Sequence, residues 1–137
     1  MLTRVLDILP PAIAVLWVAG IARFRNLELP LWAWPALLAA AFALQIVATR
    51  LRGPERRIAL PPGSNPRFIA FLAALITGVF ALLVGFAVEA TLPATDDAHT
   101  TPLALRAVWH GACAFAATYC RFLARLLRRT DAAPPAA

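Results

Sequence analysis

The sequence predicts an all-α integral membrane protein, an antiparallel bundle of four transmembrane helices that forms one domain over residues 1–130. Its composition is 61% hydrophobic, whereas soluble domains contain about 45–50% apolar residues. Four apolar stretches each reach the roughly 17–25 residues that cross a hydrocarbon core about 30 Å thick. Most charged residues fall between these stretches, which are Val5–Ala22, Leu31–Thr49, Phe68–Leu92 and Leu103–Leu127.

The first stretch is interrupted by Pro10-Pro11, and we expect these prolines to kink a single span. The alternative is a short interfacial helix over residues 1–9, followed by a new helix that starts at Pro11. A cleaved secretory signal is disfavoured, because Asp7 and the proline pair interrupt its start and three apolar stretches follow. Asp7 could couple protons inside a membrane, but Arg4 lies three residues away and favours a local ion pair.

The second stretch opens with Trp32 and Trp34, and tryptophan prefers the head-group layer of a membrane. A polar hinge over residues 23–28 precedes it. Gln45 is the lone amide of the predicted helix, and we expect it to hydrogen-bond to another helix. Small residues spaced four apart permit close helix contact in lipid. The alanines with this spacing are candidate packing residues, namely Ala36, Ala39, Ala40 and Ala43.

The third stretch is the most strongly apolar of the four. Asn65 is the expected cap of its helix, and Pro66 occupies the first helical position. Gly78 and Gly85 are seven residues apart and share one helical face. Glycine in a membrane helix usually marks a close approach of a neighbouring backbone, so these two glycines are also candidate packing residues.

The fourth stretch begins after Pro102, and an Ala/Pro tail over residues 131–137 is expected to be disordered. Cys113 and Cys120 are about 10 Å apart along one helix, too far for a disulfide. His110 and Cys120 are about 15 Å apart, too far to share one ion. We therefore expect no metal site. We also expect no cofactor, because a bis-histidine haem needs a second histidine within a span.

All thirteen basic residues are arginines, and the net charge is +6. They lie at the ends of apolar stretches, which favours anionic lipid head groups over nucleic acid as partners. Only Arg23, Arg25 and Arg106 fall on the side opposite the two termini. The positive-inside rule therefore predicts a multi-pass protein with both termini in the cytoplasm. Abundant alanine, arginine and proline without lysine suggest a GC-rich bacterial genome. The predicted membrane is therefore the bacterial inner membrane. The expected lipid contacts are Arg50, Arg52, Arg56, Arg57, Arg121, Arg125, Arg128 and Arg129.

Glu89, Arg106 and His110 form a candidate polar cluster on the outer side of the membrane. Arg106 and His110 are four residues apart and share a helical face, while Glu89 ends the preceding stretch. Ionisable groups inside a membrane often mark a functional site. This one could bind an anionic head group, a quinone oxygen or a proton. The simpler interpretation is a Glu89–Arg106 ion pair at the membrane rim, where charge costs little.

The sequence leaves three functions open. The first is a non-catalytic accessory or assembly subunit that packs on partner membrane helices, and the sparse intramembrane polarity favours it. The second is a small homo-oligomeric transporter or channel that uses Glu89, Arg106 and His110. The third is a lipid- or quinone-linked enzyme, which is disfavoured because neither a nucleophile nor paired carboxylates accompany the histidine. The expected partners are membrane lipids and other membrane subunits or a second copy.

Overall fold

The computed structural model describes residues 2–25, 27–51, 63–91 and 101–130. These residues form four α-helices and no strand. The helices are α1 (Leu2–Phe24), α2 (Ala33–Leu51), α3 (Pro66–Thr91) and α4 (Leu103–Thr130). The all-α prediction is therefore confirmed, and the predicted tail over residues 131–137 lies outside the described residues.

Helix α1 runs without interruption through Pro10 and Pro11. A separate interfacial helix over residues 1–9 is therefore not formed. Helix α3 begins at Pro66 as the sequence predicts, and the Asn65 Oδ1 atom accepts a hydrogen bond from the Arg67 backbone N–H at 2.9 Å. This side-chain cap occupies a backbone donor at the start of a helix, where no intrahelical partner is available.

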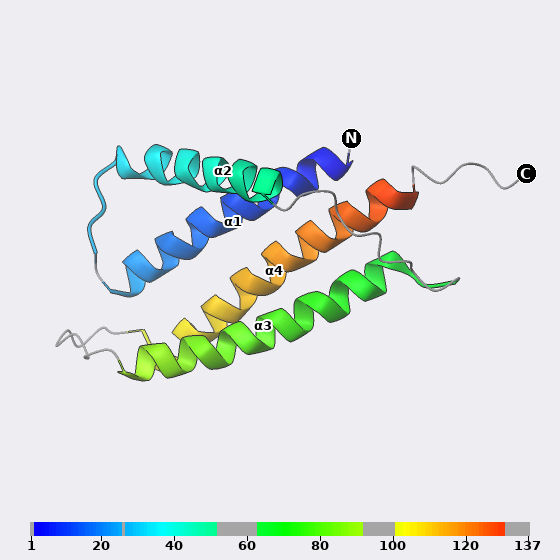
Figure 1. Ribbon diagram of the computed structural model, residues 1–137. Coiled ribbons are helices and arrows are strands. Elements are labelled where there is room, and N and C mark those ends of the chain that lie inside the picture. Colours follow the sequence, from blue (N-terminus) through cyan, green and yellow to red (C-terminus); the bar gives the residue numbers. More distant parts are fainter. Residues whose placement is uncertain (1, 26, 52–62, 92–100, 131–137) are drawn as a thin grey trace, which may run out of the picture.

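The helices lie in the order α3, α4, α1, α2, with each neighbour antiparallel to the next (Figure 1). Helix α4 packs on both α3 and α1, whereas α2 packs on α1 alone among the described residues. The four helices therefore form an open array rather than a closed bundle. The first turn of α1 and the last turn of α4 lie at one end, which we call the terminal end; the opposite end is the hinge end.

Glycine allows α3 and α4 to approach closely. A Cβ atom placed on Gly78 would lie 2.9 Å from the Phe115 Cβ and 3.1 Å from the Gly111 carbonyl oxygen. A Cβ on Gly111 would lie 2.9 Å from the Gly78 carbonyl oxygen. Gly85 lies seven residues further along the same face of α3, and a Cβ atom placed on it would lie 2.9 Å from the His110 Cβ. Any larger residue at these positions would push the two backbones apart.

None of the described side chains of helix α2 is buried. The side chain of Gln45 crosses to α1, where its Nε2 atom donates to the Asp7 backbone carbonyl at 2.7 Å. The face of α2 that carries the candidate packing alanines is turned away from α1, and each of them is exposed: Ala36, Ala39, Ala40 and Ala43. These alanines therefore make no interhelical packing within the described chain.

The apolar core is thin and lies at the terminal end, around Leu6, Ala70, Leu123, Ala124 and Leu126. Many other large apolar side chains are exposed, and they occur on all four helices. Among the described residues, two helices are long and apolar enough to cross a membrane, Val5–Phe24 and Pro66–Thr91, and Ala33–Ala48 is a shorter apolar helix. The sequence predicts four such spans. Helix α4 does not qualify by this measure because polar and charged side chains recur along it.

Candidate functional site

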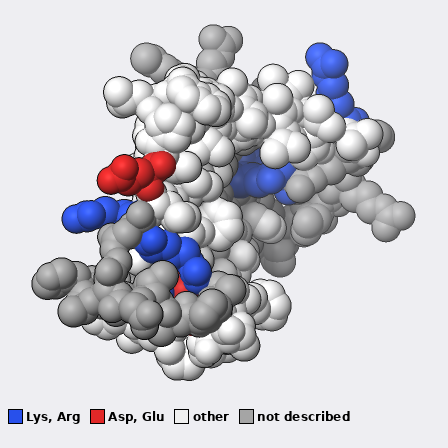
Figure 2. Space-filling model, turned by 90° about the vertical axis from the view of Figure 1, so that its left-hand side faces the viewer, with Lys and Arg blue, Asp and Glu red and all other residues white. Residues whose placement is uncertain are grey.

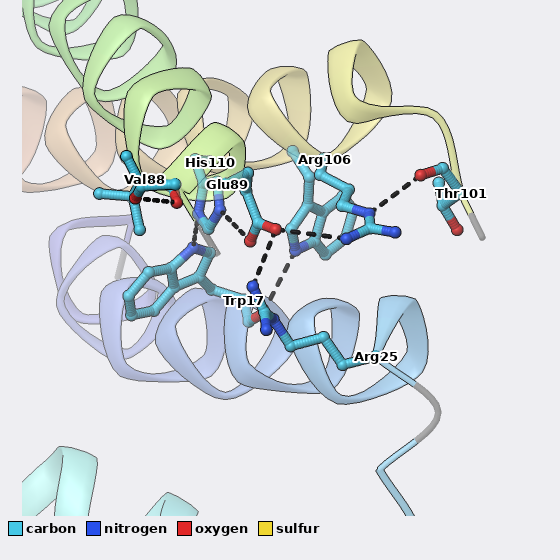
Figure 3. Close-up of polar contacts among 9 residues, drawn as sticks. Trp17, Arg25, Val88, Glu89, Thr101, Arg106 and His110 are labelled. Atoms are coloured by element: carbon cyan, nitrogen blue, oxygen red, sulfur yellow. Dashed lines mark hydrogen bonds and ion pairs between the residues drawn. The ribbon is translucent and has the colours of Figure 1, made fainter. Parts of the chain in front are cut away.

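Glu89 is the centre of a polar cluster at the hinge end (Figure 3). Its Oε2 atom accepts from Arg25 Nη2 at 3.0 Å and from Arg106 Nη1 at 3.4 Å. Its Oε1 atom lies 3.4 Å from His110 Nε2. The last turn of α3, the first turns of α4 and the residue that follows α1 supply these groups. The structure thus brings together the three residues that the sequence singled out and adds Arg25.

The hydrogen bonds of His110 assign its tautomer. The indole N–H of Trp17 donates to His110 Nδ1 at 2.7 Å. Because an indole nitrogen can only donate, Nδ1 must be the accepting nitrogen of the ring. Nε2 then carries the proton and donates it to Glu89. The ring thus links Trp17 of α1 to the Glu89 carboxylate. The rings of Trp17 and His110 also pack edge to face at 5.7 Å between centroids.

The cluster is largely withdrawn from the surface but carries a net positive charge. The side chain of Glu89 is 5% exposed, and those of Arg106 and Arg25 are 13% and 22% exposed. Arg106 also donates from Nε to the Thr101 backbone carbonyl at 2.9 Å. Two guanidinium groups face one carboxylate, so the formal charge of these three groups is +1. Of the two arginines, Arg25 is the more exposed.

Sequence reasoning missed two members of the cluster, Arg25 and Trp17. Arg25 lies in the polar hinge after α1, so it resembled a loop charge. A signal for it was present, because the arginine distribution already placed Arg25 on the same side as Arg106. Trp17 lies in the middle of an apolar stretch without polar neighbours, and its hydrogen bond depends on how α1 crosses α4. No local pattern reports that crossing.

A groove adjoins the cluster, and we call it the α1–α3 groove. It is bounded by residues 10–25 of α1 and the adjoining hinge, residues 80–89 of α3 and residues 110–117 of α4, and its volume is about 710 Å³. Helix α4 forms its floor, because α1 and α3 both pack on α4 and not on each other within the described residues. Its lining is apolar except at the hinge end, where Arg25, Glu89 and His110 close it.

The arginines at the terminal end form a separate group. Arg128 Nη2 donates to Asp7 Oδ1 at 2.7 Å, and both side chains are substantially exposed. Asp7 is thus paired with α4, while the side chain of Arg4 lies outside the described residues. Arg50 is exposed at the end of α2, and Arg121 and Arg125 are half-buried on α4. The remaining predicted lipid contacts lie outside the described side chains: Arg52, Arg56, Arg57 and Arg129.

The two cysteines are free and half-buried, and Cys113 lines the α1–α3 groove. Within the described ranges, no three His, Cys, Asp or Glu side chains are grouped closely enough to hold a metal ion. No protein-family model, curated protein or solved structure matches this chain. In the cluster, one carboxylate contacts three side chains that can donate to it. The two arginines together have ten N–H donors, which is more than one carboxylate can accept.

Proposed function

We propose that this chain is a multi-pass protein of the bacterial inner membrane with a non-catalytic role, an accessory or assembly subunit that packs on partner membrane helices. The observation that carries the proposal is the extent of exposed apolar side chains. Trp32, Leu44 and Phe80 are 72%, 70% and 67% exposed, and similar side chains cover every helix. Soluble monomers rarely expose contiguous apolar patches larger than a few hundred Å². Lipid and partner helices are the natural cover for this surface.

The polar residues of α4 are compatible with a membrane crossing because of where they lie. Arg106 and His110 are paired with Glu89 between α1 and α3, and pairing inside a protein is how ionisable groups are tolerated in membranes. Viewed from the hinge end, the charged atoms of the described residues form a few separate groups among uncharged atoms (Figure 2). Helix α4 would thus cross as a central helix that its two neighbours shield from lipid.

The orientation follows from the arginines at the two ends. The terminal end carries Arg50, Arg67, Arg121, Arg125 and Arg128, whereas the hinge end carries Arg23, Arg25 and Arg106. Arginine is enriched in cytoplasmic segments near membrane spans. We therefore place the terminal end, and with it both chain termini, in the cytoplasm. Arginines at that end would also contact anionic lipid.

Helix α2 is the best candidate for the partner-binding surface. None of its described side chains is buried, and its outward alanines at spacing four offer the small-residue face that membrane helices use for close packing. A transporter is supported less well, because the Glu89 carboxylate accepts from three donors in the cluster. A carboxylate held in this way is poorly suited to exchange a proton or an ion in each transport cycle.

The test is purification of the tagged chain from native membranes in mild detergent. We expect it to fractionate with membranes after alkaline washing and to copurify with a larger complex. Ala39→Trp and Ala43→Trp, on the outward face of α2, should release that complex, whereas Ala87→Trp on an exposed face of α3 should retain it. Recovery of the chain as a detergent-free soluble protein, or as a monomer from native membranes, would refute the proposal.

A further inference from the structure

We propose that the α1–α3 groove binds one acyl chain of an anionic phospholipid, with the lipid phosphate held at Arg25. This inference rests on the membrane location in the proposed function, and it adds a specific ligand that an accessory subunit does not require. Four properties of the groove support it: its volume, its length, its lining and the charge at its hinge end.

The groove is elongated and has room for a hydrocarbon chain. Its lining runs along α1 from Pro10 to Arg25, a distance of roughly 22 Å at a rise of about 1.5 Å per residue. Its volume is about 710 Å³. A flexible hydrocarbon chain can therefore lie along the groove from one end towards the other.

The length of the groove requires an extended chain. One leaflet of a hydrocarbon core is about 15 Å deep, half of the full thickness of about 30 Å. The groove is longer than this, so a chain that enters beside Arg25 at the hinge end lies along the protein over the depth of the outer leaflet and beyond. A short polar ligand would leave most of the apolar lining uncovered.

The lining of the groove is that of a chain-binding site. Ile13 and Ile21 from α1 face Phe80 and Val84 from α3 across it. On its floor and edge, small residues leave the space that the chain would occupy, namely Ala81, Ala114 and Ala117. Pockets for small molecules usually have about 300–1,000 Å³ of mostly apolar space with a few polar groups that fix orientation. The groove has this composition, with its polar groups gathered at one end.

The charge of the cluster selects the head group. Arg25 uses Nη2 to donate to Glu89, and a guanidinium has five N–H donors in a planar fork. Arg25 is also the most exposed cation of the cluster and lines the groove. Guanidinium and phosphate form strong paired hydrogen bonds. With a formal charge of +1, the cluster favours an anionic head group, whereas the choline of phosphatidylcholine would bring another cation beside Arg25 and Arg106.

The test uses native mass spectrometry of the full chain released from lipid nanodiscs that contain equal amounts of phosphatidylglycerol and phosphatidylcholine with identical acyl chains. We expect the wild type to retain one phosphatidylglycerol, with a preference of about tenfold over phosphatidylcholine, which corresponds to about 1.4 kcal/mol. Arg25→Gln should reduce this preference to about onefold. Arg23→Gln, which changes an exposed arginine at the same end, should leave the preference unchanged.

A second pair of variants tests the groove itself. Ala81→Phe places a ring inside the groove and should lower the retained lipid by about tenfold, whereas Ala87→Phe on an exposed face of the same helix should not. Ala81→Leu, a smaller addition, should give an intermediate loss, and far-UV circular dichroism checks that each variant is folded. Equal retention by Ala81→Phe and Ala87→Phe, or equal binding of the two lipids by the wild type, would overturn the proposal.

The outcomes also separate this proposal from the proposed function. A chain that fails to enter nanodiscs overturns both. A chain that enters them but retains no phosphatidylglycerol overturns the lipid site alone, because packing on partner helices through α2 does not depend on the groove.

Discussion

Replacing Glu89 with glutamine removes the one negative charge of the polar cluster while keeping the shape of the side chain. Arg25 and Arg106 then face each other without a carboxylate between them, and the amide can accept from only one of its two terminal atoms. His110 loses its acceptor at Oε1 if the amide nitrogen takes that position. Since the cluster joins α1, α3 and α4, we expect Glu89→Gln to destabilise the packing of all three helices.

The structure sets the size of this effect. Breaking a buried ion pair by removing one partner costs roughly 3–5 kcal/mol. We expect the lower end of that range, about 3 kcal/mol, because Arg25 remains 22% exposed to its surroundings. Arg106 also keeps its hydrogen bond to the Thr101 carbonyl at 2.9 Å. Both observations reduce the penalty of leaving the two guanidinium groups without a counter-ion.

The assay is reversible unfolding of the purified protein by titration of dodecyl maltoside micelles with dodecyl sulfate, followed by far-UV circular dichroism. Glu28→Gln is the control, because it removes an exposed carboxylate at the same end of the molecule and should change stability by less than about 0.5 kcal/mol. The double variant Glu89→Gln/Arg25→Gln should lose about 1 kcal/mol less than the sum of the two single variants. A Glu89→Gln protein as stable as Glu28→Gln would show that the cluster does not hold the helices together.

Three further predictions follow from other contacts. Gly111→Val should destabilise the protein by about 1–3 kcal/mol through overpacking against Gly78 and Leu82, whereas Ala112→Val, one exposed position along, should not; equal melting temperatures would contradict the close contact. Asp7→Asn should cost at most about 1 kcal/mol in the same dodecyl sulfate titration, because its pair with Arg128 is largely exposed. In a Cys113→Ala/Cys120→Ala background, a membrane-impermeant maleimide should label Thr101→Cys from outside spheroplasts and Ser64→Cys only after lysis; the reverse pattern would invert the proposed orientation.

The helical elements could be predicted from sequence because their signals are local. Apolar runs of membrane length indicated the helices, and Asn65 with Pro66 fixed the start of α3 through a cap that involves only neighbouring residues. The spacing of Arg106 and His110 placed both on one helical face. Their contact with Glu89 could be anticipated, because a short connection between antiparallel helices brings the end of α3 near the start of α4.

The arrangement of the helices could not be predicted in the same way. The alanines of α2 satisfy the small-residue spacing, yet they face away from α1. Small residues spaced four apart identify a surface that can pack closely, but they do not specify which helix, or which chain, covers it. Gly111 shows the converse case, because its role depends on the facing Gly78, and neither residue alone specifies the register of α3 on α4.

The central position of α4 explains why its composition is misleading. A helix that contacts lipid on all sides must be apolar on all sides, whereas α4 has α3 on one flank and α1 on the other. Its polar residues near the hinge end lie between those flanks, where Glu89 and Trp17 supply partners. Those partners come from two different helices, so the polar character of α4 is matched only after all three helices are assembled. A chain in which α1 could not reach α4 would leave His110 without its Trp17 donor and Glu89 without Arg25. The same crossing opens the groove beside the cluster, so the assembly of α1 on α4 both pairs the charges of the cluster and forms the proposed lipid site.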